Sequence, residues 1–281
     1  MKINKYPDGS SYINLGDKIP SLVKTWKINS YEDLWHLNQY VDAYNNYTGQ
    51  SPIIVIPNLV DAQADRRFNK DESSGLKLVC EFLNGMNANF KIFHPHNPEV
   101  VEALMDNVEI IDNSEFITKV LLEGLIKDCP SILQNGISND NLILMSSDAG
   151  GFKPLIKLCD KIKWGGQIHS CSKGRSWDGT KSELTQRIGK DNFYGKDILI
   201  IDDICVRGGT FKGLSKLLKQ RNCGKLYLAV SHMTLQNLGK DPVTNYFDKV
   251  FTTNSKFDEY FIPDADECPY NPKNLEIIKL F

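Results

Sequence analysis

The sequence predicts an α/β protein made of two lobes, each with a mostly parallel sheet flanked by helices. Short apolar runs alternate along the chain with stretches whose apolar residues recur at helical spacing. Runs such as 53–56, 142–145 and 198–201 are apolar throughout, which is typical of strands buried on both faces. The polar residues 138–141 indicate a linker. We therefore expect an N-terminal lobe at 1–137 and a C-terminal lobe at 138–281.

The elements of the first lobe follow from local patterns. Tyr6-Pro7-Asp8-Gly9 predicts a turn, because Pro fixes φ at one turn position and Gly relieves strain at a later one. We expect strands at 22–28, 53–56 and 90–93, and helices at 31–47 and 76–83. The segment 97–117 is expected to form a helix, a short strand and a second helix beginning near residue 114.

In the second lobe, apolar runs predict strands at 142–145, 167–171, 198–201, 225–231, 250–253 and 275–280. A helical pattern begins near residue 210. Residues 172–183 contain Gly, Ser, Asp and several cations without apolar periodicity, so we expect a flexible loop there. Segment 261–272 is expected to be rich in turns.

The amino-acid composition argues against a nucleic-acid-binding or membrane-spanning protein. A chain of 281 residues that is 41% hydrophobic can bury a large core, and its net charge of -2 gives no basic surface for nucleic acid. No apolar stretch approaches the roughly 20 residues that span a bilayer. The seven cysteines lack paired metal spacing, and the amino terminus lacks an apolar signal segment. We expect a soluble cytoplasmic protein that acts on small molecules, without nucleic-acid or membrane partners.

The clearest functional signal lies in residues 197–218. An apolar strand ends in Asp202 and Asp203, and a turn with Gly208 and Gly209 leads into a helix near Thr210. A glycine turn before a helix N-terminus can bind a phosphate, and two carboxylates at the solvent-facing end of a parallel strand can hold a vicinal diol or a divalent metal. The implied ligand is a ribose phosphate.

This stretch resembles the phosphoribosyl-diphosphate loop of type I phosphoribosyltransferases and of ribose-phosphate diphosphokinase (PRPP synthetase). The residues that match are Asp202, Asp203, Gly208, Gly209 and Thr210. Val206 and Arg207 replace the family's Asp and Thr. The resemblance implies that the two acids hold ribose hydroxyls and that residues 207–210 bind the 5-phosphate. It also implies two phosphoribosyltransferase-like lobes.

Two N-terminal segments resemble the ATP-binding parts of PRPP synthetase. Tyr6 and Asp8 match the aromatic and acidic residues that reach the adenine of ATP bound by a neighbouring subunit, which implies at least a dimer. Asp65, Arg66 and Arg67 match the second half of the flag region. Ser10, Gln63 and Ala64 depart from the family pattern, and the family's first strand and helix are missing. An ordinary turn and a solvated charged loop remain alternative interpretations.

Four further residues complete the resemblance, which spans roughly residues 6 to 260. His96 and Asp148 match residues that border the magnesium site, and Lys173 and Arg175 match cations that stabilise the transferring diphosphate. His94 replaces the family's Asp, and no zinc site is expected at His94 and His96, because no other ligands accompany them. His36 and His169 are expected to be structural.

The resemblance implies transfer of the β,γ-diphosphoryl group of Mg-ATP to the anomeric hydroxyl of a ribose 5-phosphate moiety, with release of AMP. Mg²⁺ would be the cofactor and ATP the co-substrate. Val206 and Arg207 make the loop more positive, which favours ADP-ribose over ribose 5-phosphate, as in phage-encoded relatives that rebuild NAD. A one-lobed phosphoribosyltransferase activity and a non-catalytic regulatory homologue remain alternatives.

Overall fold

The protein forms two compact units in a computed structural model that describes residues 1–16, 20–126, 140–177, 182–234, 241–256 and 274–281. One unit is Met1–Asp112 together with Phe281, and the other is Asn113–Leu280. The division comes earlier than the expected boundary at 137/138. Part of the expected linker at 138–141 and the expected turn-rich segment 261–272 lie outside the described residues.

Tertiary packing explains the earlier division. Helix α4 (Ser114–Lys119) continues into the π-helix η1 (Val120–Gly124), and the apolar side chains Phe116, Ile117 and Leu121 are buried. Helix α4 contacts α5 of the second unit, and the carbonyl of Gly124 accepts a hydrogen bond from Lys249 Nζ at 3.2 Å. The amphipathic pattern predicts this helix, but it cannot say which sheet covers its apolar face.

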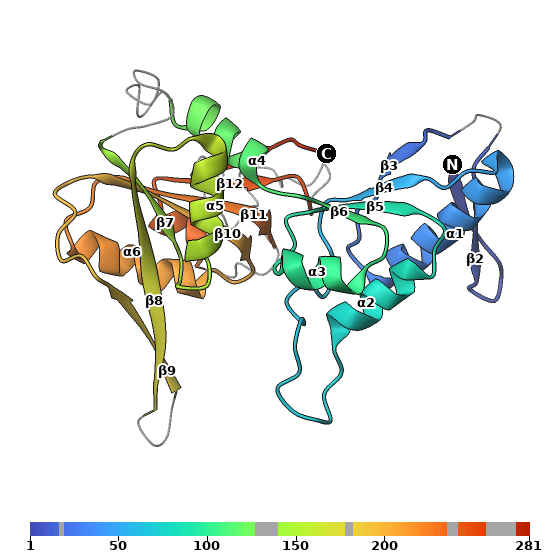
Figure 1. Ribbon diagram of the computed structural model, residues 1–281, viewed down its shortest axis with the longest axis horizontal. Coiled ribbons are helices and arrows are strands. Elements are labelled where there is room, and N and C mark those ends of the chain that lie inside the picture. The colour runs from blue at the N-terminus through green and yellow to red at the C-terminus, as the bar shows by residue number, and fades with distance from the viewer. Residues whose placement is uncertain (17–19, 127–139, 178–181, 235–240, 257–273) are drawn as a thin grey trace. The chain divides into compact units, whose positions relative to one another are not determined.

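The first unit contains a four-stranded parallel sheet in the order β3-β4-β5-β6, shown in Figure 1. Its strands are β3 (Val23–Thr25), β4 (Ile53–Ile56), β5 (Asn89–Phe93) and β6 (Val108–Ile111). Its helices are α1 (Tyr31–Thr48), α2 (Gly75–Asn84) and α3 (Pro98–Leu104). These elements confirm the expected order, although β3 is shorter than the expected strand at 22–28. Helix faces and sheet share one buried apolar core.

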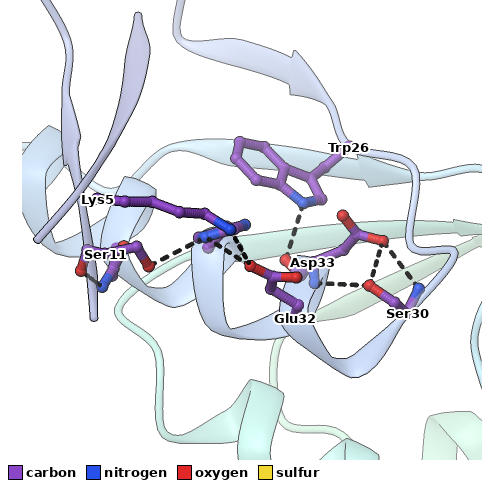
Figure 2. Close-up of polar contacts among 8 residues, drawn as sticks. Lys5, Ser11, Trp26, Ser30, Glu32 and Asp33 are labelled. Carbon is purple, nitrogen blue, oxygen red and sulfur yellow. Dashed lines mark hydrogen bonds and ion pairs between the residues drawn. The ribbon is translucent and has the colours of Figure 1, made fainter. Parts of the chain in front are cut away.

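Helix α1 begins where its local chemistry predicts. Ser30 Oγ accepts a hydrogen bond from the N–H of Asp33 at 3.2 Å, and Asp33 Oδ2 accepts one from the N–H of Ser30 at 2.8 Å. This reciprocal cap satisfies two donors at the helix start. Trp26 Nε1 donates to the Asp33 carbonyl at 3.1 Å, which ties the preceding segment to the same turn (Figure 2). The helix ends at Gly49, which has a left-handed φ of 69°.

A two-stranded antiparallel hairpin, β1 (Lys2–Lys5) and β2 (Ser11–Asn14), is attached to α1. Lys5 Nζ lies 3.5 Å from Glu32 Oε1 (Figure 2). Ser11 Oγ lies 3.1 Å from Nε2 of the buried His36. Gln39 Nε2 also donates to the Ser11 carbonyl at 2.6 Å. His36 therefore has the structural role expected from the sequence, and the hairpin is fixed on the helix.

The second unit contains a seven-stranded sheet in the order β13-β12-β11-β10-β7-β8-β9. All neighbouring pairs are parallel except β8 and β9. Its strands are β7 (Leu142–Ser146), β8 (Gln167–Trp177), β9 (Ser182–Ile188), β10 (Asp197–Cys205), β11 (Leu226–Met233), β12 (Lys249–Thr253) and β13 (Leu275–Ile278). The α/β class with parallel sheets flanked by helices is confirmed.

Two helices and one short 3-10 turn complete the described part of the second unit: α5 (Phe152–Ile162), α6 (Gly209–Gln220) and η4 (Val243–Tyr246). The central strands β7 and β10 are buried along their apolar runs. Such runs form the middle of a parallel sheet because helices cover both faces. Among the described residues, no helix combines the length and apolar character needed to cross a membrane.

Candidate active site

The strand order of the second sheet places a switch point between β7 and β10. The chain passes from β7 to β8 on one side, whereas from β10 it passes to β11 on the other side. Ligands of open parallel sheets bind outside the carboxyl ends of the strands where this direction reverses. Asp148 follows β7, and Asp202 and Asp203 follow the last pairing of β10 with β7. The sheet thus brings three expected site residues to one edge.

The two acids lie within β10 rather than at its end, where the sequence predicted them, and both are partly buried. Strand β10 continues to Cys205, because residues 204 and 205 pair with β11. The Asp202 carboxyl is partly buried: one oxygen accepts a hydrogen bond from the Ser147 hydroxyl and the other accepts one from the N–H of Asp203 at 2.9 Å. Burial, followed by the negative charge of Asp203, raises the pKa of Asp202 to about 7.

The turn after β7 fixes Asp148 beside this pair. Ser146 Oγ donates to the Asp148 carbonyl at 2.8 Å, and the N–H of Gly151 donates to Asp148 Oδ1 at 3.0 Å. Ser147, between them, reaches Asp202 on the neighbouring strand. Asp148 is partly buried. Ser147 is a site residue that the sequence analysis missed, because nothing local shows that its hydroxyl reaches the next strand.

The phosphate-sized loop has the predicted form. Gly208 precedes α6 and has a left-handed φ of 72°, and the helix begins at Gly209. The Thr234 hydroxyl donates to the Val206 carbonyl at 3.0 Å, and the Gly208 carbonyl accepts from the N–H of Lys212 at 2.9 Å. The first N–H groups of a helix lack partners within the helix and can donate hydrogen bonds to a phosphate. Arg207 is exposed beside this N-terminus.

A second set of contacts joins the helix that follows the loop to η4 and to Asp241 just before it. Lys212 Nζ donates to the carbonyl oxygen of Asp241, and its carboxylate Oδ2 lies 3.4 Å away. The Tyr246 hydroxyl donates to the same carboxylate at 2.8 Å. These hydrogen bonds lower the pKa of Asp241, with the bond from Tyr246 as the largest cause. The first turn of α6 is therefore anchored to η4.

The two loop glycines are expected to differ when each is replaced by Ala. At Gly208 a Cβ would lie 2.7 Å from Val243 Cβ on a backbone with φ of 72°. We expect Gly208→Ala to cost about 2 kcal/mol or more of unfolding free energy. At Gly209 a Cβ would meet nothing within 4 Å. Gly209→Ala should keep Tm unchanged, yet raise the KM for a phosphorylated acceptor about tenfold, because the added methyl occupies the space expected for phosphate.

Thermal unfolding and acceptor titration of both variants check this expectation. Gly209→Ala is the matched control for stability, since it adds the same methyl group one residue later. An unchanged Tm for Gly208→Ala would contradict the strain argument. An unchanged acceptor KM for Gly209→Ala would place the phosphate elsewhere.

The basic segment that was expected to be a flexible loop is instead a β-hairpin. Strand β8 pairs with β7 only over residues 167–170 and then continues to Trp177 as an antiparallel ribbon with β9 (Figure 1). Lys173 pairs with Gln186 and Arg175 with Leu184. Residues 178–181 lie outside the described residues. Cross-strand pairing, which the local composition does not reveal, converts the expected loop into a ribbon that fixes the backbone of these two residues opposite β9.

His169 lies on the part of β8 that pairs with β7, as expected. Its ring meets the Phe193 ring edge-on, with centroids 6.0 Å apart. Burial lowers the pKa of this histidine, and the nearby cations Lys190 and Lys196 lower it further. A neutral imidazole packed on an aromatic ring fits the structural role expected for His169.

In the first unit, the expected turn at residues 6–9 joins β1 to β2. The N–H of Gly9 donates to the Tyr6 carbonyl at 3.0 Å, and Gly9 has a φ of 88°. The Tyr6 ring is exposed and packs on Tyr12 at 5.1 Å. Asp8 accepts hydrogen bonds from the hydroxyl of Ser10 at 2.7 Å and from its N–H at 2.9 Å, which lower the Asp8 pKa. Ser10, the departure from the family pattern, therefore fixes Asp8.

The flag segment and the histidine segment meet through Asn97. Asn97 Nδ2 donates to Asp65 Oδ2 at 3.1 Å, while its Oδ1 caps α3 by accepting from the N–H of Val100 at 3.3 Å. The Asp65 side chain is buried, and its other oxygen lies 3.4 Å from Arg66 Nε. Arg66, Arg67 and His96 are exposed. The structure thus joins Asp65 to the residue that follows His96, and Asn97 is a further site residue that sequence reasoning missed.

The side-chain oxygen and nitrogen atoms at these positions can be compared with the ligands that Mg²⁺ prefers. Among the described residues, no group of three or more His, Cys, Asp or Glu side chains is arranged to hold a metal ion. Mg²⁺ commonly keeps several waters and uses one or two carboxylates together with substrate phosphates. The half-exposed carboxylates of Asp148 and Asp203 at the switch point fit that pattern. The imidazole of His96 does not, because Mg²⁺ prefers oxygen ligands.

Comparison with known proteins agrees with this geometry. No protein-family model matches the chain. Ribose-phosphate pyrophosphokinase of Saccharolobus solfataricus is 24% identical over 241 residues, which cover 84% of this chain and 77% of that relative. The Fusobacterium nucleatum protein of the same name is 23% identical over 283 residues, covering 99% and 82%.

The chain is similar to ribose-phosphate pyrophosphokinases over most of its length. A crystal structure of phosphoribosylpyrophosphate synthetase from Mycobacterium smegmatis has a TM-score of 0.74, at 16% identity, and covers 99% of this chain and 85% of its own. The two proteins share a fold. The motifs at residues 6–8, 65–67, 96, 148, 173–175 and 202–210 therefore lie within a chain that matches these relatives almost from end to end.

Proposed function

We propose that this protein is an ATP-dependent diphosphotransferase of the ribose-phosphate pyrophosphokinase type. It moves the β,γ-diphosphoryl group of Mg-ATP to the anomeric hydroxyl of a ribose 5-phosphate moiety and releases AMP. The observation that carries this proposal is the pairing of two acids with a glycine phosphate loop at the switch point of the second sheet. Similarity to ribose-phosphate pyrophosphokinases over most of the chain supports it.

Each group of residues has a role that its chemistry suits. Asp202 and Asp203 hold the ribose hydroxyls, because carboxylates accept hydrogen bonds from a diol. Residues 207–210 bind the 5-phosphate through backbone N–H groups and the Arg207 guanidinium. Lys173 and Arg175 neutralise charge on the migrating diphosphate. Such a transfer needs positioning and charge neutralisation rather than a covalent nucleophile.

The first unit supplies the ATP site in this proposal. Arg66 and Arg67 bind the nucleotide phosphates, with Asp65 holding Arg66 in place. Tyr6 and Asp8 reach the adenine of ATP in a neighbouring subunit, which requires at least a dimer. His96 donates to the triphosphate, and Asp148 contributes a carboxylate oxygen to Mg²⁺, which supplies charge neutralisation when bound. The protein works on these small molecules in the cytoplasm, without nucleic-acid or membrane partners.

The acceptor is proposed to be ADP-ribose rather than ribose 5-phosphate. Val206 and Arg207 stand where the family loop that this stretch resembles has Asp and Thr, so the loop is more positive. Arg207 is exposed beside the start of α6, and its planar fork suits the oxygens of a second phosphate. The product, ADP-ribose 1-diphosphate, would serve NAD resynthesis. Ribose 5-phosphate, which gives PRPP, is the alternative acceptor.

Incubation with Mg-ATP and each acceptor separately tests both the diphosphoryl transfer and the choice of acceptor. We expect AMP release with a matching mass gain of the acceptor, and a kcat/KM about tenfold higher for ADP-ribose. Arg207→Thr should reduce that preference to near unity, because one bidentate contact with phosphate is lost. A preference for ribose 5-phosphate that Arg207→Thr leaves unaltered would refute the ADP-ribose assignment. AMP release with neither acceptor would refute diphosphoryl transfer and leave a regulatory homologue or a phosphoribosyltransferase.

A further inference from the structure

Gln186 on β9 connects the β8–β9 hairpin to the phosphate loop. Its backbone pairs with Lys173 across the hairpin. Its side-chain Nε2 donates a hydrogen bond to the carbonyl of Thr210, in the first turn of α6, at 3.0 Å. One residue therefore contacts both the strand that carries the expected diphosphate-binding cations and the helix that carries the expected acceptor-phosphate site.

Gly213 in α6 makes room for this contact. A Cβ at this position would lie 2.6 Å from Gln186 Oε1, and the other contact within 4 Å is also with Gln186. Glycine is less favourable than alanine in a helix interior, so its use here needs a local reason. The close approach of the Gln186 amide to the helix is such a reason. The Gln186 amide thus occupies the space on α6 that a side chain at Gly213 would fill.

The far end of α6 holds β9 in a similar way. Arg221, directly after the helix, donates from Nη1 to the Ile188 carbonyl at 2.7 Å and also to the Lys190 carbonyl. Helix α6 therefore contacts β9 near its first turn through Gln186 and the end of β9 through Arg221. Strand β9 cannot slide along the helix without breaking polar contacts at both ends.

We propose that Gln186 is a positioning residue, which holds the Lys173 strand at a set distance from the phosphate loop. This inference rests on the proposed function. In a reaction that depends on charge neutralisation at a moving diphosphoryl group, small displacements of cations cost rate rather than substrate affinity. Gln186 itself touches no substrate. It acts by keeping the hairpin and the first turn of α6 in one arrangement.

Gln186→Ala tests the proposal in the full-length protein with Mg-ATP and the better of the two acceptors. We expect kcat to fall about tenfold, while the KM values for ATP and acceptor stay within about twofold. Gln186→Glu should behave similarly, because an ionised carboxylate has no N–H to donate to the Thr210 carbonyl. Loss of one hydrogen bond should lower Tm by only a few degrees.

Gly213→Ala separates positioning from stability. The added methyl displaces the Gln186 amide, so kcat should fall, whereas Tm should not, because Ala favours the helix. In the double variant Gln186→Ala/Gly213→Ala, kcat should equal that of Gln186→Ala alone, since the methyl then displaces nothing. Gly189→Ala is the matched control: it lies just after β9, a Cβ there meets nothing within 4 Å, and neither kcat nor Tm should change.

The outcomes distinguish this inference from the proposed function. If the unaltered protein releases AMP but Gln186→Ala keeps kcat within twofold, the positioning role is wrong and the proposed function stands. Additive losses in the double variant would also overturn the role, because Gly213 would then act independently of Gln186. If the unaltered protein releases AMP with neither acceptor, the proposed function is wrong. The kinetic role of Gln186, which rests on that function, is then wrong as well.

Discussion

Diphosphoryl transfer is expected to vanish when both acids of β10 are replaced, as in Asp202→Asn/Asp203→Asn. The pair lies at the switch point, and an amide offers the ribose hydroxyls one acceptor oxygen in place of a charged carboxylate. We expect kcat/KM to fall by about a thousandfold or more, measured as AMP release. Ser147→Ala is an informative companion, since it removes the hydrogen bond to Asp202 and leaves both acids in place. Near-normal turnover in the double variant would exclude the acids from the reaction.

Thermal unfolding of the single variant Asp202→Asn serves as the control for folding. In the folded protein the Asp202 pKa is raised from its ordinary 3.8 to about 7, because burial and the charge of Asp203 disfavour ionisation. Its contribution to stability is therefore complete below about pH 4 and is lost as the pH rises through about 7. Asn does not titrate. The Tm of Asp202→Asn should rise relative to that of the unaltered protein between pH 4 and pH 8, and a constant difference would contradict the raised pKa.

The second large effect is expected at the hairpin. Lys173→Ala and Arg175→Ala should each lower kcat by about a hundredfold or more with modest changes in KM, because the cations act where charge develops during transfer. Both residues lie on β8, beyond its pairing with β7 and within its pairing with β9. A paired ribbon gives the backbone of these residues a more defined position than a flexible loop would, which strengthens the expectation of an effect on kcat.

Arg187→Ala provides the matched control for charge removal on the same hairpin. Arg187 is exposed on β9, and its backbone pairs with Ser172. Removing this cation should leave kcat within about twofold. If the losses at Lys173 and Arg175 appear in KM alone, these cations bind the ground state. If Arg187→Ala loses as much kcat as they do, the effect comes from the net charge of the hairpin rather than from two specific residues.

Much of the fold was predictable because its signals are local. The apolar run of β10 and the helical spacing after Gly208 identify a strand and a helix without any knowledge of their neighbours. Ser30 and Asp33 fix the start of α1 in the same way, through a cap made within four residues. The glycine turn before α6 was predictable because a left-handed φ favours glycine.

Other features depend on partners that are distant in the sequence. Residues 172–183 were expected to form a loop, but the described residues among them belong to the β8–β9 hairpin, whose stability comes from cross-strand pairing rather than from an apolar period. Strand β10 was expected to end before Asp202, but its pairing with β11 extends it to Cys205. Helix α4 was expected in the first lobe but lies in the second compact unit, because its apolar face could pack on either sheet and its packing on α5 decides which one covers it.

The α/β class was readable from the amino-acid sequence because strand and helix patterns alternate along it, and the acid pair, the glycine loop and their PRPP-synthetase-like spacing were readable because they lie within about 20 residues of one another. Only the tertiary structure decided that Ser147 reaches Asp202, that Asn97 joins Asp65 to the His96 segment, and that Gln186 meets Thr210. These contacts join residues separated by at least 24 positions. A side chain's partner at such separation depends on strand order and register, which no local pattern encodes.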